Sequence, residues 1–361
     1  MIEKHEFNGF TYKMDTIKGD LTGFELVHGK AKPKSIYKYY GISSFSIDAL
    51  KNGYFYASHP MELNDHLDSS NFLLGASKPI DYEFYERFLG EAYGKEIEQL
   101  KKYYDDDSVS KDGIFYSTGF ISELWQVMSN IFGIISLTSQ DKSDLMWPHY
   151  TNEKGFQIMF ETEELETSIK AQIGDDECLG LFPMNYCENL YPIDLSDFSF
   201  FHTPFLYLTN VKKNSWAYED EWRFIVSKKN MGIPFSKVGL DPRDDHKGDK
   251  ENRRAYYDKN IIKEITLGNN FFTGREFDID RSAKDFIIVK PLKSKNNWNY
   301  QDHIDFLEYV YENFSDRLYY SGKTFNINDG DQPYLIRTKE RLEIENLGDN
   351  KYKLTRTNDF Y

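Results

Sequence analysis

The most regular pattern along the chain is a set of short runs rich in aromatic and β-branched residues. Each run is bounded by polar or Gly-containing segments, which is typical of β-strands. The runs that we expect to form strands are IYKYY (36–40), YFYAS (54–58), FGIISLTS (132–139), FQIMFET (156–162), LFPMNYC (181–187), EWRFIVS (221–227), IKEITLG (262–268) and FIIVKPL (286–292). The segment RLEIENLGDNKYKLTR predicts a β-hairpin that turns at Gly348, Asp349 and Asn350.

Apolar residues spaced at the helical period predict several helices between these strands. The clearest covers residues 81–104, where Tyr85, Leu89 and Leu100 fall on one side and Asp81 is placed to cap the start. The other helices are expected at 44–51 (capped by Ser43 or Ser44), 119–130, 163–171 and 302–318. Because strands and helices mix without a regular βαβ rhythm, we expect an α+β fold: a mixed or antiparallel central sheet with flanking helices.

Composition and charge narrow the class of protein. The 361 residues suffice for about two domains, or one enlarged domain, at roughly 150 residues each. The net charge of −15 disfavours broad nucleic-acid binding. The longest apolar stretch, 131–137, is too short for a membrane helix, and the N-terminus does not read as a secretion signal. We therefore expect a cytoplasmic protein without membrane contact.

Two further compositional features bear on chemistry and surface. With only Cys178 and Cys187, the chain has neither a disulfide framework nor a zinc site, and we expect no metal. Residues 241–254 contain no apolar side chain other than Pro242, which predicts a surface excursion. P-loop, GxGxxG, HExxH and GxSxG motifs do not occur in the sequence, which argues against the enzyme classes that carry them.

The sharpest chemical pattern is SWAYEDEWRFIV, residues 215–226. On a strand, alternate side chains share a face, so Glu219, Glu221 and Arg223 are expected to line up on one side and Trp222 on the other. Close like charges raise the pKa of one carboxyl, whereas a nearby Arg lowers it. Such a row can stabilise a developing cation or bind a ribose hydroxyl. The alternative is a solvated edge strand with a surface ion pair.

A second pattern, LMWPHYTN (145–152), places His149 beside Tyr150. Pro148 is expected to impose an extended or turn geometry before His149. A His in such a place can shuttle a proton or orient a substrate. The alternative is a structural His beneath Trp147.

A third pattern, SHPMELNDHLD (58–68), is a loop that holds two His, an Asn and two Asp. Oxygen-rich loops can bind a divalent ion, but EF-hand spacing is missing here. We favour a structural turn for Asn64 and Asp65, since these residue types bond to their own backbone. A metal site is the alternative.

Five of these segments occur in an order that resembles one bacterial family, the domain-of-unknown-function 2971 family (DUF2971). They are IYKYY, LKNGYFYASHPMELNDHLD, DLMWPHYTNEKGFQIMF, KNSWAYEDEWRFIV and IKEITLG. The resemblance covers about residues 36 to 269. It implies a core domain at 36–274, an N-terminal extension at 1–35 and a C-terminal α/β extension at 275–361 packed on the core.

The opening strand, short helix and second strand also resemble the start of ADP-ribosyltransferase folds. Those enzymes use a polar residue on the first strand, a Ser or Tyr on the second and a later catalytic Glu. The resemblance implies Lys38 or Tyr39, then Ser58, then Glu219 and Glu221 in these places. It further implies NAD as cofactor, with Tyr39 or Tyr56 stacking on nicotinamide and a Glu stabilising an oxocarbenium-like ribose.

On this interpretation the protein is an NAD-consuming enzyme of a bacterial conflict or defence setting, and its acceptor is an unknown protein, nucleic acid or small molecule. The expected catalytic residues are Glu221, Glu219 and His149, and the expected cofactor-binding residues are Lys38, Tyr39, Tyr56, Ser58, Asn64, Tyr150 and Arg223. Tyr39, Ser58, His149 and Glu221 are expected to border one cavity. The alternatives are a metal-dependent phosphoesterase or nuclease, which would use Asn64, Asp65, Asp68 and His149, and a non-catalytic ligand-sensing module.

Overall fold

The computed structural model describes residues 2–18, 23–77, 121, 124–125, 128–174, 178–228, 231–232, 250–295, 297–326 and 332–360. The chain divides into two compact units. Unit 1 comprises Met1–Lys32, Phe55–Ser136 and Glu166–Tyr256, and unit 2 comprises Pro33–Tyr54, Leu137–Leu165 and Tyr257–Tyr361. The units alternate along the sequence, whereas the expected division at residues 35 and 274 is linear. That linear division stays a prediction.

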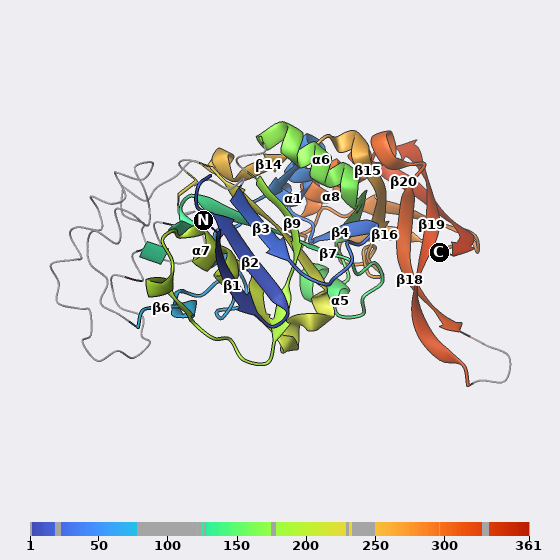
Figure 1. The fold of residues 1–361 in the computed structure, drawn as a ribbon. Helices are drawn as coiled ribbons and strands as arrows, with labels where there is room; N and C mark the ends of the chain where they lie inside the picture. Colours follow the sequence, from blue (N-terminus) through green and yellow to red (C-terminus); the bar gives the residue numbers. More distant parts are fainter. Residues whose placement is uncertain are drawn as a thin grey trace. The chain divides into compact units, whose positions relative to one another are not determined.

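Unit 2 is built on a mixed β-sheet (Figure 1). Its strand order is β16 (Phe277–Asp280), β17 (Phe286–Pro291), β20 (Lys351–Phe360), β19 (Tyr334–Gly348), β18 (Leu318–Asn326), β15 (Ile262–Leu267), β8 (Phe156–Glu161), β4 (Ser35–Tyr40) and the end of β7 (Phe132–Thr138). Neighbouring strands are antiparallel except β15 and β18, which run parallel. The expected hairpin at 348–350 is confirmed as the connection between β19 and β20.

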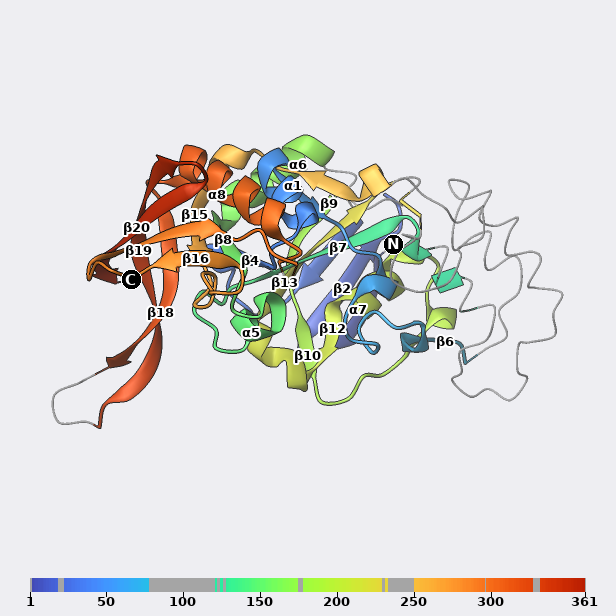
Figure 2. The ribbon, with the colours of Figure 1, turned by 180° about the vertical axis from the view of Figure 1, so that it is seen from behind.

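The α-helices that lie wholly in the described part of unit 2 are α1 (Ser44–Asn52), α5 (Met146–Thr151) and α8 (Tyr300–Phe314). Helix α1 begins at a capping box in which the side chains of Ser43 and Ser46 bond to each other's backbone, and it ends at Gly53 with a left-handed φ of 68°. Helices α1 and α8 lie side by side (Figure 2). The core includes Phe156 on β8 and Phe306 on α8, whose ring centroids are 4.7 Å apart.

Unit 1 contains smaller sheets around a buried helix. Strands β1 (Ile2–Phe7), β2 (Phe10–Asp15) and β3 (Phe24–Val27) form an antiparallel sheet (Figure 1). Strand β13 (Glu221–Ser227) lies between the start of β7 and β9 (Cys178–Pro183). Two-stranded pairs join β10 (Asn185–Cys187) to β12 (Val211–Lys213), β6 (Leu74–Gly75) to β11 (Ile193–Asp194), and β5 (Tyr54–Tyr56) to β14 (Arg254–Tyr256).

Helix α7 (His202–Asn210) of unit 1 is buried along its whole length. Its apolar side chains pack with Phe132 of β7 and Ile225 of β13 in one core cluster. Asn210 at its end accepts a hydrogen bond from the Tyr12 hydroxyl at 2.7 Å. This bond attaches the N-terminal sheet to the rest of the unit.

The α+β expectation with a mixed central sheet is confirmed. Several element boundaries differ from the expected ones. The LFPMNYC run is split between β9 and β10, and helix α6 runs from Thr162 to Ile173. The last helix ends at Phe314 because Leu318 already begins β18. The helix expected at 81–104 and most of the one at 119–130 lie outside the described residues.

The prediction that residues 241–254 form a surface excursion is wrong at the C-terminal end of the segment. Residues 241–249 lie outside the described residues, but Arg253 is fully buried. Its guanidinium donates hydrogen bonds to the backbone carbonyls of Ala57, Phe132, Ser129 and Gly232. A charged side chain is buried here because backbone oxygens accept its hydrogen bonds.

None of the helices in the described part of the chain is long and apolar enough to cross a membrane.

Candidate functional site

The carboxylates of the EDE segment do not all sit on one strand. Residues Asn214–Glu219 form a 3-10 turn, and Asp220 has a left-handed backbone with φ 39°. Strand β13 begins only at Glu221. The expected pleated face is therefore correct for Glu221 and Arg223 and wrong for Glu219, because the strand period cannot pass through the left-handed residue between them.

Lys212 brings the two glutamates together from strand β12. Its Nζ lies 2.5 Å from Glu219 Oε2 and 2.9 Å from Glu221 Oε2. The same ammonium lies 4.9 Å from the ring centroid of Trp216, which is on the 3-10 turn. Only 3% of the Lys212 side chain is exposed. One buried cation thus links β12, the turn and β13.

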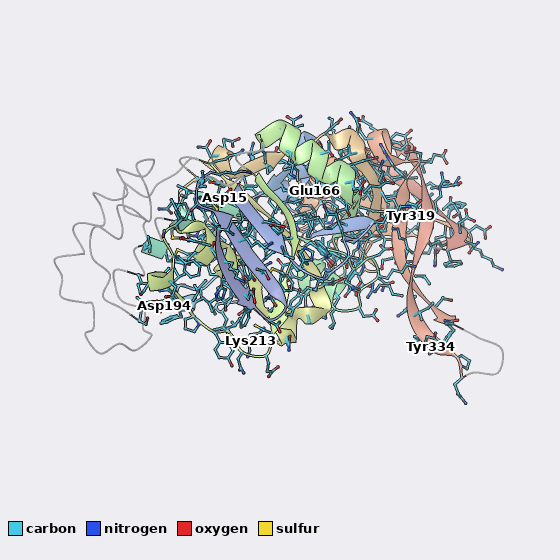
Figure 3. All side chains as sticks on the ribbon, in the orientation of Figure 1. Asp15, Glu166, Asp194, Lys213, Tyr319 and Tyr334 are labelled. Carbon is cyan, nitrogen blue, oxygen red and sulfur yellow. The ribbon has the colours of Figure 1, made fainter. Side chains whose placement is uncertain are left out.

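Lys213, the next residue, lies at the margin of unit 1 (Figure 3), where its Nζ donates a hydrogen bond to the carbonyl of Glu188.

Arg223 adds a second cation and a third carboxylate to this cluster. Its Nε donates to Glu221 Oε1 at 2.7 Å, and its Nη1 donates to Asp68 Oδ1 at 2.9 Å and to the carbonyl of Thr209 at 2.7 Å. Asp68 Oδ2 also lies 3.6 Å from Lys212. We call these five residues, Asp68, Lys212, Glu219, Glu221 and Arg223, the charge cluster. Three carboxylates and two cations give it a formal charge of −1.

The charge cluster is buried, and opposite charges within it favour the ionised forms of Glu221 and Lys212. Burial by itself would raise the pKa of Glu221, but the charges and hydrogen bonds of Arg223 and Lys212 outweigh it and hold that pKa well below its ordinary value. Burial would lower the pKa of Lys212, but Glu221, Asp68 and Glu219 together raise it to about 12. Since Glu219 and Glu221 are 2% and 4% exposed, the alternative of a solvated edge strand is wrong.

The oxygens of Glu221 are well supplied with donors. Oε1 accepts from Arg223 Nε, and Oε2 accepts from Lys212 and, at 3.2 Å, from Arg223 Nη2. The backbone nitrogen of Glu221 donates to the Tyr186 hydroxyl at 2.9 Å. Because a carboxylate offers about four lone-pair positions, Glu221 is a fixed, occupied acceptor that positions the two cations.

The other expected site residues of unit 1 make local contacts. The Tyr56 hydroxyl donates to Glu62 at 3.2 Å, and the backbone of Ser58 pairs with Ile134 in an isolated bridge. Asn64 is exposed. Asp65 accepts a bond from the Leu67 nitrogen at 3.0 Å, as the structural-turn interpretation of this loop expects.

In unit 2, the residues around Trp147 differ from expectation. Pro148 lies inside the first turn of helix α5, where its missing N–H costs nothing. Of the extended or turn geometry expected before His149, the extended form is therefore wrong. His149 is exposed, whereas Trp147 is buried beneath Tyr39, with ring centroids 5.1 Å apart. His149 therefore does not lie under the Trp. Tyr150, also on α5, is half-buried.

Tyr39 and Lys38 are on β4. The Tyr39 hydroxyl shares its one proton between the carbonyls of Gln140 and Asp141, at 2.9 and 2.8 Å, and burial raises its pKa. Lys38 Nζ lies 5.9 Å from the ring centroid of Tyr40. Tyr39 and His149 belong to unit 2 and Ser58 and Glu221 to unit 1, so their shared cavity stays a prediction. Among the described residues, no group of three or more His, Cys, Asp and Glu is arranged to hold a metal ion.

Sequence reasoning missed Lys212 as a member of the site and assigned Asp68 only to the metal alternative. The available signal for Lys212 was charge balance: two glutamates beside one Arg require another cation if they are buried. Asp68 ends the LNDHLD segment, but its distance from Arg223 in sequence hides the pair.

Comparison with known proteins covers part of this site. Residues 146–224 match the model of a family described as "Protein of unknown function (DUF2971)". The match contains four members of the charge cluster and ends within β13, while Asp68 precedes it. No curated protein and no solved structure matches the chain.

Proposed function

We propose that this chain, which belongs to the DUF2971 family through residues 146–224, is an NAD-consuming enzyme that transfers ADP-ribose. The observation that carries the proposal is the pair of carboxylates, Glu219 and Glu221, that share the ammonium of Lys212 beside the ring of Trp216. Ionised carboxylates held in a low-dielectric setting stabilise positive charge that develops on a ribose.

The reaction has a simple balance. The bond between C1′ of the ribose and the nicotinamide nitrogen breaks, and nicotinamide leaves with the electron pair. The ribose becomes oxocarbenium-like, an acceptor oxygen or nitrogen forms the new bond to C1′, and the acceptor's proton passes to solvent. The acceptor is a protein, a nucleic acid or a small molecule. Water as acceptor turns the same step into NAD hydrolysis.

The roles of the two glutamates differ. We assign Glu221 to positioning, because its oxygens already accept bonds from Lys212 and Arg223. We assign the contact with the ribose to Glu219, which lies on the same turn as two half-exposed rings, Trp216 and Tyr218, whose centroids are 6.1 Å apart. Since Glu219 is only 2% exposed, entry of NAD requires the Asn214–Glu219 turn to shift.

The cellular setting follows from the same proposal. A protein that consumes NAD acts where NAD is abundant, so we place it in the bacterial cytoplasm, where free thiols such as that of Cys187 stay reduced. Uncontrolled NAD consumption is toxic to its own cell, which suits an effector of conflict or defence.

Release of nicotinamide from NAD tests the proposal independently of the acceptor. We expect the wild-type chain to release nicotinamide, and Glu219→Gln to lower the rate about 100-fold or more. The matched control is Glu188→Gln, an exposed glutamate whose Oε2 lies 3.4 Å from Asn214 on the same turn. It is expected to keep the wild-type rate. Circular dichroism of each variant confirms folding. A folded wild type that releases no nicotinamide, or equal rates for Glu219→Gln and wild type, overturns the proposal.

A further inference from the structure

Unit 2 holds a pocket of about 330 Å³ that lies outside the charge cluster and outside the matched family region. Its lining includes residues of three neighbouring strands: Ile287 of β17, Leu354 of β20 and Leu342 of β19. Its wall includes the connection between β16 and β17, residues 281–285, together with Phe272. The volume is at the lower end of the range for small-molecule sites, about 300–1,000 Å³.

Arginine and lysine side chains give this pocket its charge. Arg281, Lys284 and Arg356 line it, against one lining carboxylate, Asp285, and the buried Glu340 behind Arg356. The sum is +1 in a chain whose net charge is −15. Arg281 and Lys284 are exposed, and neither forms an ion pair with any residue that the structure describes. A local positive field in an acidic protein favours an anionic ligand.

Arg356 is held in place rather than loosely extended. Its Nε donates to Glu340 Oε2 at 2.6 Å, and Nη2 donates to the same oxygen. Glu340 is completely buried, whereas 54% of the Arg356 side chain is exposed. Within the described residues, Nη1 has no hydrogen-bond acceptor. A pre-oriented guanidinium with an unused amino group is suited to a phosphate or carboxylate.

Three aromatic rings complete the lining: Phe272, Phe286 and Tyr320. The Tyr320 hydroxyl donates to the carbonyl of Asn269 at 2.5 Å, which fixes its ring, and the Arg356 guanidinium lies 5.8 Å from that ring's centroid. Phe286 lies on β17 and Tyr320 on β18, whereas Phe272 lies in the connection between β15 and β16. Together these rings offer apolar surface on which a planar group stacks.

We propose that this pocket binds a nucleoside monophosphate, with the base among the three rings and the phosphate at Arg281, Lys284 and Arg356. The combination of rings, cations and volume carries the proposal: the volume suits one nucleotide rather than a dinucleotide. The site is independent of the charge cluster, so its ligand need not take part in NAD consumption.

Isothermal titration calorimetry of the full chain with AMP, GMP, CMP and UMP tests the proposal. We expect at least one nucleotide to bind about tenfold or more tightly than its own nucleoside or inorganic phosphate alone. The variant Arg281→Gln is expected to weaken that nucleotide about fivefold or more, because it removes a charge-assisted bond. Arg275→Gln, at an exposed arginine that does not line the pocket, is the matched control.

Other outcomes overturn the proposal. If none of the four nucleotides binds at about 5 mM, or if Arg281→Gln and Arg275→Gln bind the nucleotide equally, the pocket is not this site. Equal binding of phosphate alone shows an anion site without base recognition and also contradicts it. If the chain releases no nicotinamide, the nucleotide titrations still test the pocket. The two proposals can therefore fail separately.

Discussion

Arg223 donates hydrogen bonds to Asp68 from both of its terminal nitrogens, although 155 positions separate the two residues in the sequence. The same guanidinium binds Glu221 through Nε. Both Arg223 and Asp68 are nearly inaccessible, at 2% and 4% exposure. The pair therefore joins the loop after β5 to strand β13 inside unit 1 through charges that water does not screen.

Removal of this guanidinium is expected to be costly. Arg223→Gln leaves Asp68 and Glu221 buried with one fewer cation, so the cluster's formal charge changes from −1 to −2. We expect a loss of about 3–5 kcal/mol in the free energy of unfolding, measured by urea denaturation. The control is Arg254→Gln, whose partner Glu251 is 56% exposed, with an expected loss below about 1 kcal/mol. Equal losses for the two variants would contradict a structural role for the Arg223 pair.

The depressed pKa of Glu221 predicts a dependence of stability on pH. The folded state releases this proton more readily than the unfolded chain, whose carboxyl has the ordinary value of 4.5. The charged form thus stabilises the fold above pH 4.5, and this contribution is lost as the pH falls further. We expect wild type to exceed Glu221→Gln in unfolding free energy at pH 7, with a difference that shrinks below pH 4.5. Urea titrations from pH 7 to pH 3 measure it, and a constant difference would refute the prediction.

The strand faces and helix ends that depend only on residues nearby in the sequence were predicted well from the local pattern. The alternation EWRFIVS placed Glu221 and Arg223 on one strand face, and the structure has that strand at Glu221–Ser227. The helix predicted at 44–51 with Ser43 or Ser44 as its cap matches α1, which Ser43 caps and which ends before Gly53. In these segments the period and the caps act within a few residues, so nothing distant alters the outcome.

The rest of the candidate site depends on distant parts of the chain. Lys212 and Asp68 reach Glu221 only through the packing of α7, β12 and the loop after β5, which no local pattern encodes. Arg253 lies in a stretch as polar as any surface loop, yet four backbone carbonyls surround it. Such burial follows from tertiary structure, because only the folded chain brings those carbonyls together.

Replacement of the buried Arg253 is also expected to lower the free energy of unfolding. Arg253→Lys keeps a cation but offers three donors to four carbonyls, and a lysine cannot reproduce the planar fork. We expect a loss of about 2–4 kcal/mol in the free energy of unfolding, since at least one buried carbonyl loses its partner. Arg254→Lys, at the neighbouring half-exposed residue, is expected to cost less than about 1 kcal/mol. A comparable loss for both, in the same urea series, would contradict the role of the carbonyl contacts.

Gly155, at the entry to β8, is required by close approach of the backbone. A Cβ at this position would lie 1.9 Å from the carbonyl oxygen of Tyr40, and neighbouring Phe156 pairs with Tyr40 in the β4–β8 register. The clash is with backbone, so Gly155→Ala must displace β4 from β8, and we expect a loss of about 3 kcal/mol or more in unfolding free energy. Gly41→Ala is the control, since its Cβ would meet only the Tyr150 carbonyl at 4.0 Å, and its effect is expected within about 0.5 kcal/mol. Thermal unfolding followed by circular dichroism compares the two. A Gly155→Ala variant as stable as Gly41→Ala would show that β4 and β8 tolerate a wider separation than this register allows.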